Sequence, residues 1–348
     1  MIIRQATNNE IATLQHFDHT KLSAINTCPT WGIVRYAHHK TMPGFGRAMA
    51  LEAGKTLHEC FSAIRLMALT REQNLPEHAE YCGRKLFGDR YDAIIKDSFS
   101  ATWEDSARNA ALSSLETSGY QDDIFDKRRT YVNLETAIIF YAMQYPVRRY
   151  PVWVSNYDDP TALVGIEIPF TLHIDFEDEY MPSCIYTGRV DGLHTNGSNV
   201  TDLLIQENKT ASRLDDAWRM SFEMAHQVTG YTIAASVISN HSVERALVLG
   251  LSLPLPRDIS KGYTTTHVTR KQFMRDSWER WLWHTVITHN AYYNRPTDAP
   301  MYTHSCNRYF RPCAFIPLCA TDPTDRKHIF EHDMVKDEWT PLDEVIGD

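Results

Sequence analysis

The sequence predicts an α/β fold, because helical and strand patterns occupy separate parts of the chain. Strand-forming residues dominate positions 152–208, and apolar residues recur at helical spacing on both sides of that segment. The chain has 348 residues, of which 43% are hydrophobic, and this is enough for a buried core in one large domain or two. The order of the elements follows from the same patterns.

Residues 1–150 are predicted to be mainly helical after a polar lead-in at 1–20. A short helix begins at Lys21, with Ser23 as its cap, and stops at Pro29. A second helix begins near Gly46, and four of its apolar residues are spaced for one buried face: Leu51, Leu57, Phe61 and Ile64. Residues 71–150 are interpreted as a helical insertion, in which 131–145 is the clearest helix.

Two strands joined by a turn are predicted between Ile185 and Arg213. The turn falls at Asn196–Asn199, where Gly, Asn and Ser are concentrated. A helix at 215–239, a strand at 245–253 and a long helix at 270–293 follow, and an acidic tail begins at residue 321. We therefore divide the chain into four segments: N-terminal helices at 1–70, the insertion at 71–150, a core at 151–300, and a cysteine-containing region with the tail at 301–348.

Composition limits the class of protein. The net charge of −9 argues mildly against a protein that binds nucleic acid over its whole surface, although a local basic groove remains open. The longest apolar stretches are far shorter than a membrane helix, and the first ten residues lack the features of a signal peptide. We expect a cytoplasmic protein without a membrane partner. Seven cysteines, an odd number, favour metal binding or burial over disulfides.

Two acids and a lysine in the predicted hairpin are the first candidate site. Glu207 and Lys209 are two residues apart on one strand, so they project to the same face, and pairing of the strands brings Asp191 close to Glu207. The two carboxylates would bind Mg²⁺ or Mn²⁺, and Lys209 would orient or activate a water molecule or stabilise developing negative charge. Taken alone, this pattern is more often ordinary surface charge.

Two further candidates lie on predicted helices. His58 would be a good third ligand for Mn²⁺ beside two carboxylates, although a single histidine on such a helix is more often a core or capping residue. Gln227 and Tyr231 are four residues apart and therefore share a helix face. They could contact phosphate or a base, or they could be a half-buried polar pair.

Three cysteines crowd the C-terminal region, spaced as Cys306-x6-Cys313-x5-Cys319, and Cys28 before Pro29 is the obvious fourth ligand. Four thiolates suit an iron–sulfur cluster or a structural zinc ion. The loose spacing and one distant ligand fit a [4Fe–4S] cluster better than zinc. The cluster would tie the segment after the long C-terminal helix to the first helix.

The order of these signals resembles the RecB-like branch of the PD-(D/E)XK nuclease superfamily. The chain has Ser-x2-Asn-x-Cys-Pro at 23–29, Gly-x2-Leu-His at 54–58, Gly-Arg-Val-Asp at 188–191, Glu-Asn-Lys-Thr at 207–210, Gln-x3-Tyr at 227–231, and then the three cysteines. It is most similar to the iron–sulfur exonucleases of that branch, which include the CRISPR-adaptation nucleases, the AddB nuclease domain and many phage proteins. The resemblance covers residues 22–64 and 160–319.

The resemblance implies a central mixed β-sheet flanked by helices, of the restriction-endonuclease type, with a C-terminal iron–sulfur region. It implies metal ligation by His58, Asp191, Glu207 and the carbonyl of Asn208, with Lys209 as the catalytic lysine. Cys28, Cys306, Cys313 and Cys319 would hold a [4Fe–4S] cluster. DNA contacts would come from Gln227 and Tyr231. Separately, a protein with a net charge of −9 must concentrate positive charge locally to bind DNA, and Arg189 and Arg213 are candidates near the site.

The function implied is a metal-dependent DNA exonuclease that acts on single-stranded ends, 5′→3′, with endonuclease activity as an open alternative. A second interpretation is a subunit that acts only with helicase or recombination partners. A third is a catalytically silent DNA-binding module with a structural cluster. The distribution of the family points to a phage protein, which would act in the host cytoplasm.

Overall fold

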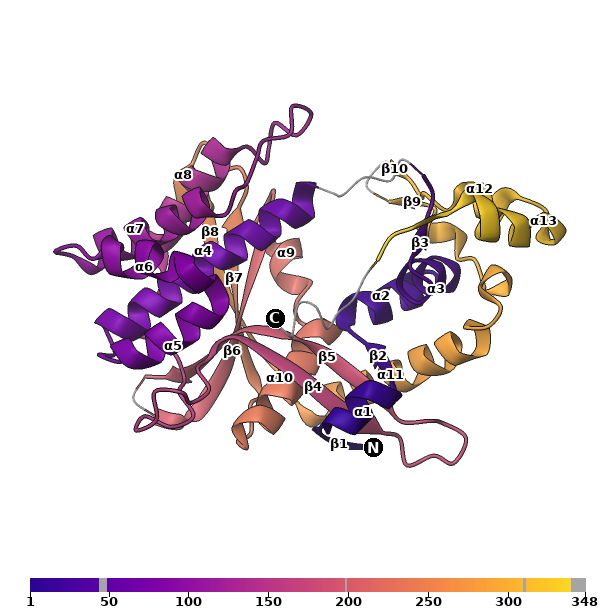
Figure 1. Ribbon diagram of the computed structural model, residues 1–348, viewed down its shortest axis with the longest axis horizontal. Coiled ribbons are helices and arrows are strands. Elements are labelled where there is room, and N and C mark those ends of the chain that lie inside the picture. Colours follow the sequence, from indigo (N-terminus) through magenta and orange to yellow (C-terminus); the bar gives the residue numbers. More distant parts are fainter. Residues whose placement is uncertain (44–48, 198, 309–310, 339–348) are drawn as a thin grey trace. The chain divides into compact units, whose positions relative to one another are not determined.

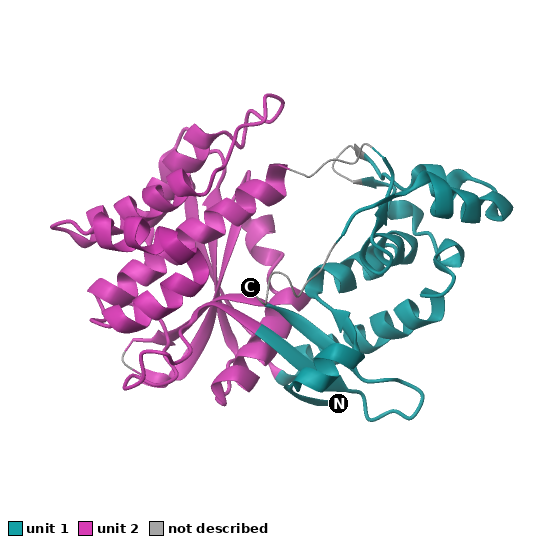
Figure 2. Ribbon diagram, in the orientation of Figure 1, with its two compact units in different colours: residues 1–46, 170–188, 272–346 teal, residues 47–169, 189–271, 347–348 magenta. Residues whose placement is uncertain are grey.

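The chain divides into two compact units that interleave along the sequence (Figures 1 and 2). The computed structural model describes residues 1–43, 49–197, 199–308 and 311–338. Unit 1 comprises residues 1–46, 170–188 and 272–346, and unit 2 comprises 47–169, 189–271 and 347–348. These units follow contacts in space and cut across the four segments proposed from the sequence, which stay a prediction.

Unit 1 joins the N-terminal helices to the C-terminal region of the chain. The Thr30 hydroxyl donates a hydrogen bond to the carbonyl of Ala299 at 2.7 Å, and Arg35 forms an ion pair of 2.5 Å with Asp337. Its elements are β1 (Ile2–Gln5), α1 (Asn8–Thr13), β2 (Gln15–Phe17), α2 (His19–Thr27), α3 (Pro29–Tyr36), β3 (Lys40–Thr41), α11 (Gln272–Tyr292), β9 (Asn307–Arg308), β10 (Arg311–Pro312), α12 (Ile316–Ala320), α13 (Pro323–His328) and β11 (Val335–Lys336).

Unit 2 holds the helices of the predicted insertion and the strands that follow them. Its elements are α4 (Met49–Arg71), α5 (Pro76–Phe87), α6 (Tyr91–Ile95), α7 (Trp103–Thr117), α8 (Tyr131–Gln144), β6 (Asn199–Ala211), α9 (Asp216–Met220), α10 (His226–Ser239), β7 (Arg245–Ser252) and β8 (Tyr263–Thr269). Across the described ranges of both units, every helix is too short or too polar to cross a bilayer.

Strands β4 (Ile166–Asp175) and β5 (Cys184–Asn196) each pass from one unit to the other. The strand order is β1-β4-β5-β6-β7-β8, with β2 beside β5. Strands β5 and β6 are antiparallel, β6 and β7 are parallel, and β7 and β8 are antiparallel. The sheet is therefore mixed, and the predicted hairpin is confirmed as β5 and β6.

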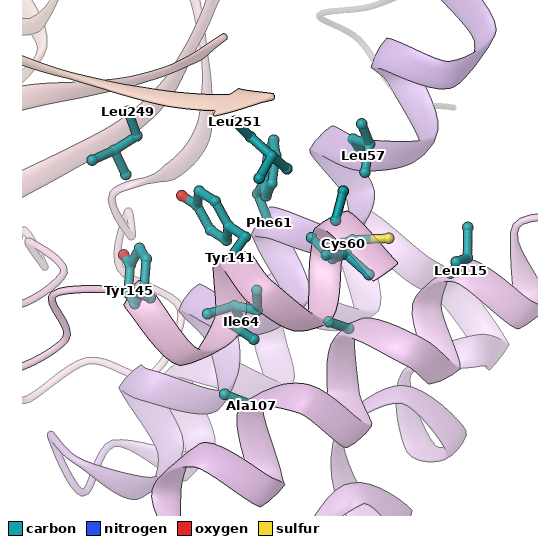
Figure 3. Close-up of a cluster of buried hydrophobic side chains, with 14 of the residues drawn as sticks. Leu57, Cys60, Phe61, Ile64, Ala107, Leu115, Tyr141, Tyr145, Leu249 and Leu251 are labelled. Carbon is teal, nitrogen blue, oxygen red and sulfur yellow. The ribbon is translucent and has the colours of Figure 1, made fainter. Parts of the chain in front are cut away.

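Helix α4 packs on the sheet of unit 2 through an apolar cluster (Figure 3). The ring of Phe61 lies 4.3 Å from that of Tyr141 on α8, centroid to centroid, and Leu249 and Leu251 of β7 belong to the same cluster. On the other face of β7, the Trp218 side chain of α9 lies against Gly250. Helices thus flank the sheet on both faces, and the packing of α4 fixes where its polar residues meet the strands.

Several predicted boundaries differ from the structure. Helix α2 begins at His19 and is capped by Asp18, whose carboxylate accepts the Lys21 N–H, so the predicted cap Ser23 lies inside the helix. The segment 1–20, predicted as a polar lead-in, contains strands β1 and β2, helix α1 and the start of α2. The predicted helix at 215–239 is interrupted between α9 and α10. The predicted start near Gly46 lies outside the described residues.

Candidate metal centre

The β5–β6 hairpin brings Asp191, Glu207 and Lys209 together. Gly192 stands opposite Gln206 in the antiparallel register, which places the preceding Asp191 beside Glu207. The backbone N–H of Asn208 donates to Asp191 Oδ2 at 2.7 Å, and Lys209 Nζ lies 2.6 Å from Glu207 Oε1. The prediction that Glu207 and Lys209 project together is confirmed.

Helix α4 adds His58 to this group. His58 Nδ1 lies 3.5 Å from Asp191 Oδ1, and the imidazole is 34% exposed, whereas the Asp191 side chain is only 8% exposed. The histidine therefore stands at the solvent side of a buried carboxylate. This position is open to a ligand, which a core histidine would not be.

Glu167 is a member of the site that the sequence did not reveal. Its Oε1 lies 3.7 Å from His58 Nδ1 and accepts a hydrogen bond of 3.2 Å from the Ser62 hydroxyl. Glu167 has a positive φ of 47° in strand β4, a conformation that is uncommon for residues other than glycine and is often found at functional sites. The only signal in the sequence is a single acid within an apolar strand, between Ile166 and Ile168.

His58, Glu167 and Asp191 form a group that fits a divalent metal ion. One donor atom from each side chain lies within 4.8 Å of the other two. Ligands on adjacent corners of a Mg²⁺ octahedron, with bonds of about 2.1 Å, stand about 3 Å apart, so small side-chain shifts would complete such a shell. In addition, Glu207 Oε2 is buried and has no hydrogen-bond partner among the described residues. An oxygen in this position is suited to a cation.

The charges of the site are strongly coupled. Burial lowers the pKa of His58, but the carboxylates of Asp191 and Glu167 outweigh it and raise the pKa to about 9. Burial and the Asp191 carboxylate raise the pKa of Glu207 to about 7, against the effect of Lys209. Burial lowers the pKa of Lys209, but Glu207 and Asp191 raise it overall. A metal ion bound by Nδ1 would therefore displace a proton from His58 at neutral pH.

A second polar layer lies behind the carboxylates. Arg65, two turns after His58 on α4, is fully buried and donates to the carbonyl of Asp191 at 2.8 Å and to Gln206 Oε1 at 3.0 Å. The Tyr141 hydroxyl donates to Asn208 Oδ1 at 2.7 Å, and the Tyr145 hydroxyl donates to Gln206 Oε1 at 3.2 Å. These contacts fix α4 and α8 to the two strands that carry the site.

We expect Arg65→Met to lower the free energy of unfolding by about 3 kcal/mol, because the change leaves buried acceptors without their charged donor. Urea unfolding measures the loss. Arg108→Met is the matched control, since Arg108 forms an exposed ion pair with Asp105, and its effect should stay below about 1 kcal/mol. Equal midpoints and slopes for the two variants would contradict a structural role for Arg65.

The predicted DNA-contact residues also lie in unit 2. Gln227 and Tyr231 are confirmed on one face of α10, where the Gln227 amide donates to the Tyr231 hydroxyl at 3.1 Å, and α10 packs against β6. Arg189 is half-buried on β5, two residues before Asp191, and Arg213 is exposed just after β6. Their roles toward DNA, and the role of the Asn208 carbonyl toward a metal, stay predictions.

The four predicted cluster ligands gather in unit 1. Cys28 is buried between α2 and α3, and the N–H of Cys313 donates to the carbonyl of Cys306 at 2.8 Å. Burial raises the pKa of the Cys319 thiol to about 11, and the thiols of Cys28, Cys313 and Cys306 contribute to the rise. Cys319 thus lies within electrostatic reach of the other three thiols, and their role as cluster ligands stays a prediction.

Comparison with known proteins does not identify a family or a function for this chain. No protein-family model and no curated protein matches the chain. Among solved structures, the crystal structure of SSO0001 is similar with 15% sequence identity and a TM-score of 0.28. The matched region covers 44% of this chain and 58% of that chain, so the chain spans less than two thirds of its length. A likeness at this level carries no argument about fold or function.

Proposed function

We propose that the protein is a metal-dependent DNA nuclease, acting most readily on single-stranded ends. The observation that carries the proposal is the donor group of His58, Glu167 and Asp191 beside the buried Glu207–Lys209 ion pair. Hydrolysis of a phosphodiester needs charge neutralisation at the phosphoryl oxygens and an activated water molecule. Hard oxygen donors, an imidazole and an ammonium group within one small region meet these needs.

Each residue of the site would have a separate chemical role. Asp191, Glu167 and His58 would hold a Mg²⁺ or Mn²⁺ ion, which supplies Lewis-acid polarisation of the scissile phosphate. Lys209, held by Glu207, would orient the attacking water and stabilise negative charge as it develops. The N–H of Asn208 fixes the Asp191 carboxylate, and Arg65 and Tyr141 hold the strands that carry these groups in position.

The mixed sheet flanked by helices supports assignment of unit 2 to the restriction-endonuclease-like core of the PD-(D/E)XK superfamily. The order of motifs resembles that of the iron–sulfur exonucleases. On this ground we extend the proposal to an exonuclease with 5′→3′ polarity and a [4Fe–4S] cluster. The grouping of Cys28, Cys306, Cys313 and Cys319 supports the cluster, and its role would be to hold the C-terminal region of unit 1 to helices α2 and α3.

A catalytically silent DNA-binding subunit of a recombination complex is the alternative. The buried Glu207 argues against it, because one of its oxygens has no hydrogen-bond partner among the described residues and lies beside a second buried acid, which destabilises a fold unless a cation binds there. A protein that only bound DNA would have no chemical need for this pair.

The proposal predicts that the purified protein cleaves end-labelled single-stranded DNA with Mn²⁺ and not with EDTA. Lys209→Ala should lower the cleavage rate at least about 100-fold, the scale of losing one group that stabilises charge in the transition state. Lys261→Ala, which removes an exposed lysine of unit 2, should cleave as the wild type does. Equal product from wild type and Lys209→Ala would refute the catalytic assignment.

A further inference from the structure

A polar pocket lies in unit 2, at the closed end of the β5–β6 hairpin. The cavity has a volume of about 230 Å³ and is lined by Arg149, Tyr150, Asn196, Leu204, Arg245 and His267. Two guanidinium groups, a phenol, an amide and an imidazole thus surround one small cavity. Of its lining residues, only Leu204 is apolar, so the pocket is built for a polar ligand.

The pocket is held in place by the segment that follows α8. The N–H of Gly197 donates to the carbonyl of Arg149 at 3.1 Å, and the N–H of Thr195 donates to the carbonyl of Pro151 at 2.9 Å. His194 Nδ1 makes a third contact of 3.0 Å with the carbonyl of Tyr150. Three contacts in succession fix this backbone to the end of β5, so the backbone from which the Arg149 side chain extends is held in place.

The charge of the pocket favours an anion. The guanidinium of Arg149 lies 5.3 Å from the centre of the Tyr150 ring, and the Tyr150 hydroxyl lies 3.4 Å from His267 Nε2. Burial lowers the pKa of His267, and Arg149 and Arg245 lower it further. The positive charges of Arg149 and Arg245 therefore both reach the cavity at His267. The Tyr150 hydroxyl and the Asn196 amide, which line the same cavity, can donate hydrogen bonds to an anion.

Asp202 is the acid that opposes this charge. It forms an ion pair with Arg245 and accepts a hydrogen bond of 2.9 Å from the Asn196 amide. The Asp202 carboxylate thus engages N–H donors of Arg245 and Asn196 that could otherwise bind a ligand in the cavity. Arg149 is exposed, and it makes the net charge of the group positive.

The pocket is separate from the candidate metal centre but lies on the same strand. Leu204 pairs with Arg245, and Glu207 pairs with Val248, in the parallel register of β6 and β7. Three residues of strand separate the two places, a distance of about 10 Å, and side chains at this odd separation point to opposite faces of the sheet. The pocket is therefore an independent site and not an extension of the metal centre.

We propose that the pocket formed by Arg149, Arg245, Tyr150, Asn196 and His267 binds a phosphate group of a nucleic-acid strand. Guanidinium groups recognise phosphate oxygens through paired N–H donors, and hydroxyl and amide groups commonly add contacts of this kind. The nucleic acid in this proposal rests on the proposed nuclease function, whereas the anion site itself does not. The chemistry is shared by a backbone phosphate, a terminal phosphate and free inorganic phosphate.

Binding measured in EDTA tests the proposal without cleavage. The probes are oligothymidylate with a 5′-phosphate, the same oligonucleotide without it, and inorganic phosphate. Arg149→Gln should weaken oligonucleotide binding about tenfold and lower the slope of log affinity against log salt by about 0.7, the value for one lost phosphate contact on a single strand. Asp202→Asn should strengthen binding, because it releases Arg245. Arg257→Gln, an exposed arginine outside the pocket, is the control.

The three probes separate the outcomes. Equal weakening with both oligonucleotides supports a backbone phosphate, and weakening confined to the 5′-phosphorylated one supports a terminal phosphate. An effect on inorganic phosphate alone overturns the nucleic-acid part of the proposal. Unchanged affinity of Arg149→Gln and Asp202→Asn for every probe overturns the site itself. Binding that depends on Arg149, in a protein that never cleaves DNA with Mn²⁺, would leave the site standing and refute the nuclease.

Discussion

Replacing Asp191 with asparagine is expected to abolish binding of Mn²⁺ and, with it, all metal-dependent cleavage of DNA. Asp191 contacts both the helix α4 side of the site, through His58, and the strand β6 side, through Asn208. Its Oδ1 faces His58 at 3.5 Å, and its Oδ2 accepts the N–H of Asn208 at 2.7 Å. Asparagine keeps the size of the side chain and one acceptor, but it removes the negative charge that a hard cation needs.

The effect on metal binding can be measured without any substrate. Mn²⁺ at 100 times its dissociation constant should stabilise the wild type by about 2.7 kcal/mol, visible as a rise in melting temperature. Asp191→Asn should show no such rise. Asp97→Asn, an exposed aspartate of unit 2, should respond to Mn²⁺ as the wild type does. A full Mn²⁺ response in Asp191→Asn would remove this carboxylate from the metal centre.

The sequence was sufficient to place the hairpin and its charged residues, because the relevant physics is local. The turn residues at 196–199 define the chain reversal, and the two-residue repeat of a strand decides that Glu207 and Lys209 share a face. The class of fold followed from the same kind of pattern. These features depend on neighbours in the chain, so they can be read without knowing the tertiary structure.

Glu167 and Arg65 were missed because their roles depend on distant parts of the chain. Glu167 enters the site through the positive φ of its own backbone and through contact with α4, about a hundred residues away in sequence. Arg65 is at helical spacing from His58, but one arginine in an apolar helix gives no sign of burial. The break between α9 and α10 was missed because the apolar spacing of a helix continues through it, so this pattern does not indicate an interruption.

Loss of one ligand of the proposed [4Fe–4S] cluster is the second large effect that we expect. If the proposal is right, Cys313→Ala should contain much less iron than the wild type, and its solubility and its binding to DNA should fall together. The described residues of the C-terminal region contact helix α3 through a few polar contacts and a small apolar cluster around Val34, Phe315 and Leu318. A metal cluster that ties these parts together would contribute folding free energy on the order of 10 kcal/mol.

Iron content, visible absorbance and hydrogen exchange of residues 300–338 measure the consequence. Cys82→Ala is the control, because Cys82 lies on α5 in unit 2, whereas the four predicted ligands belong to unit 1. Zinc in place of iron in the wild type, or unchanged protection of 300–338 in Cys313→Ala, would contradict the cluster.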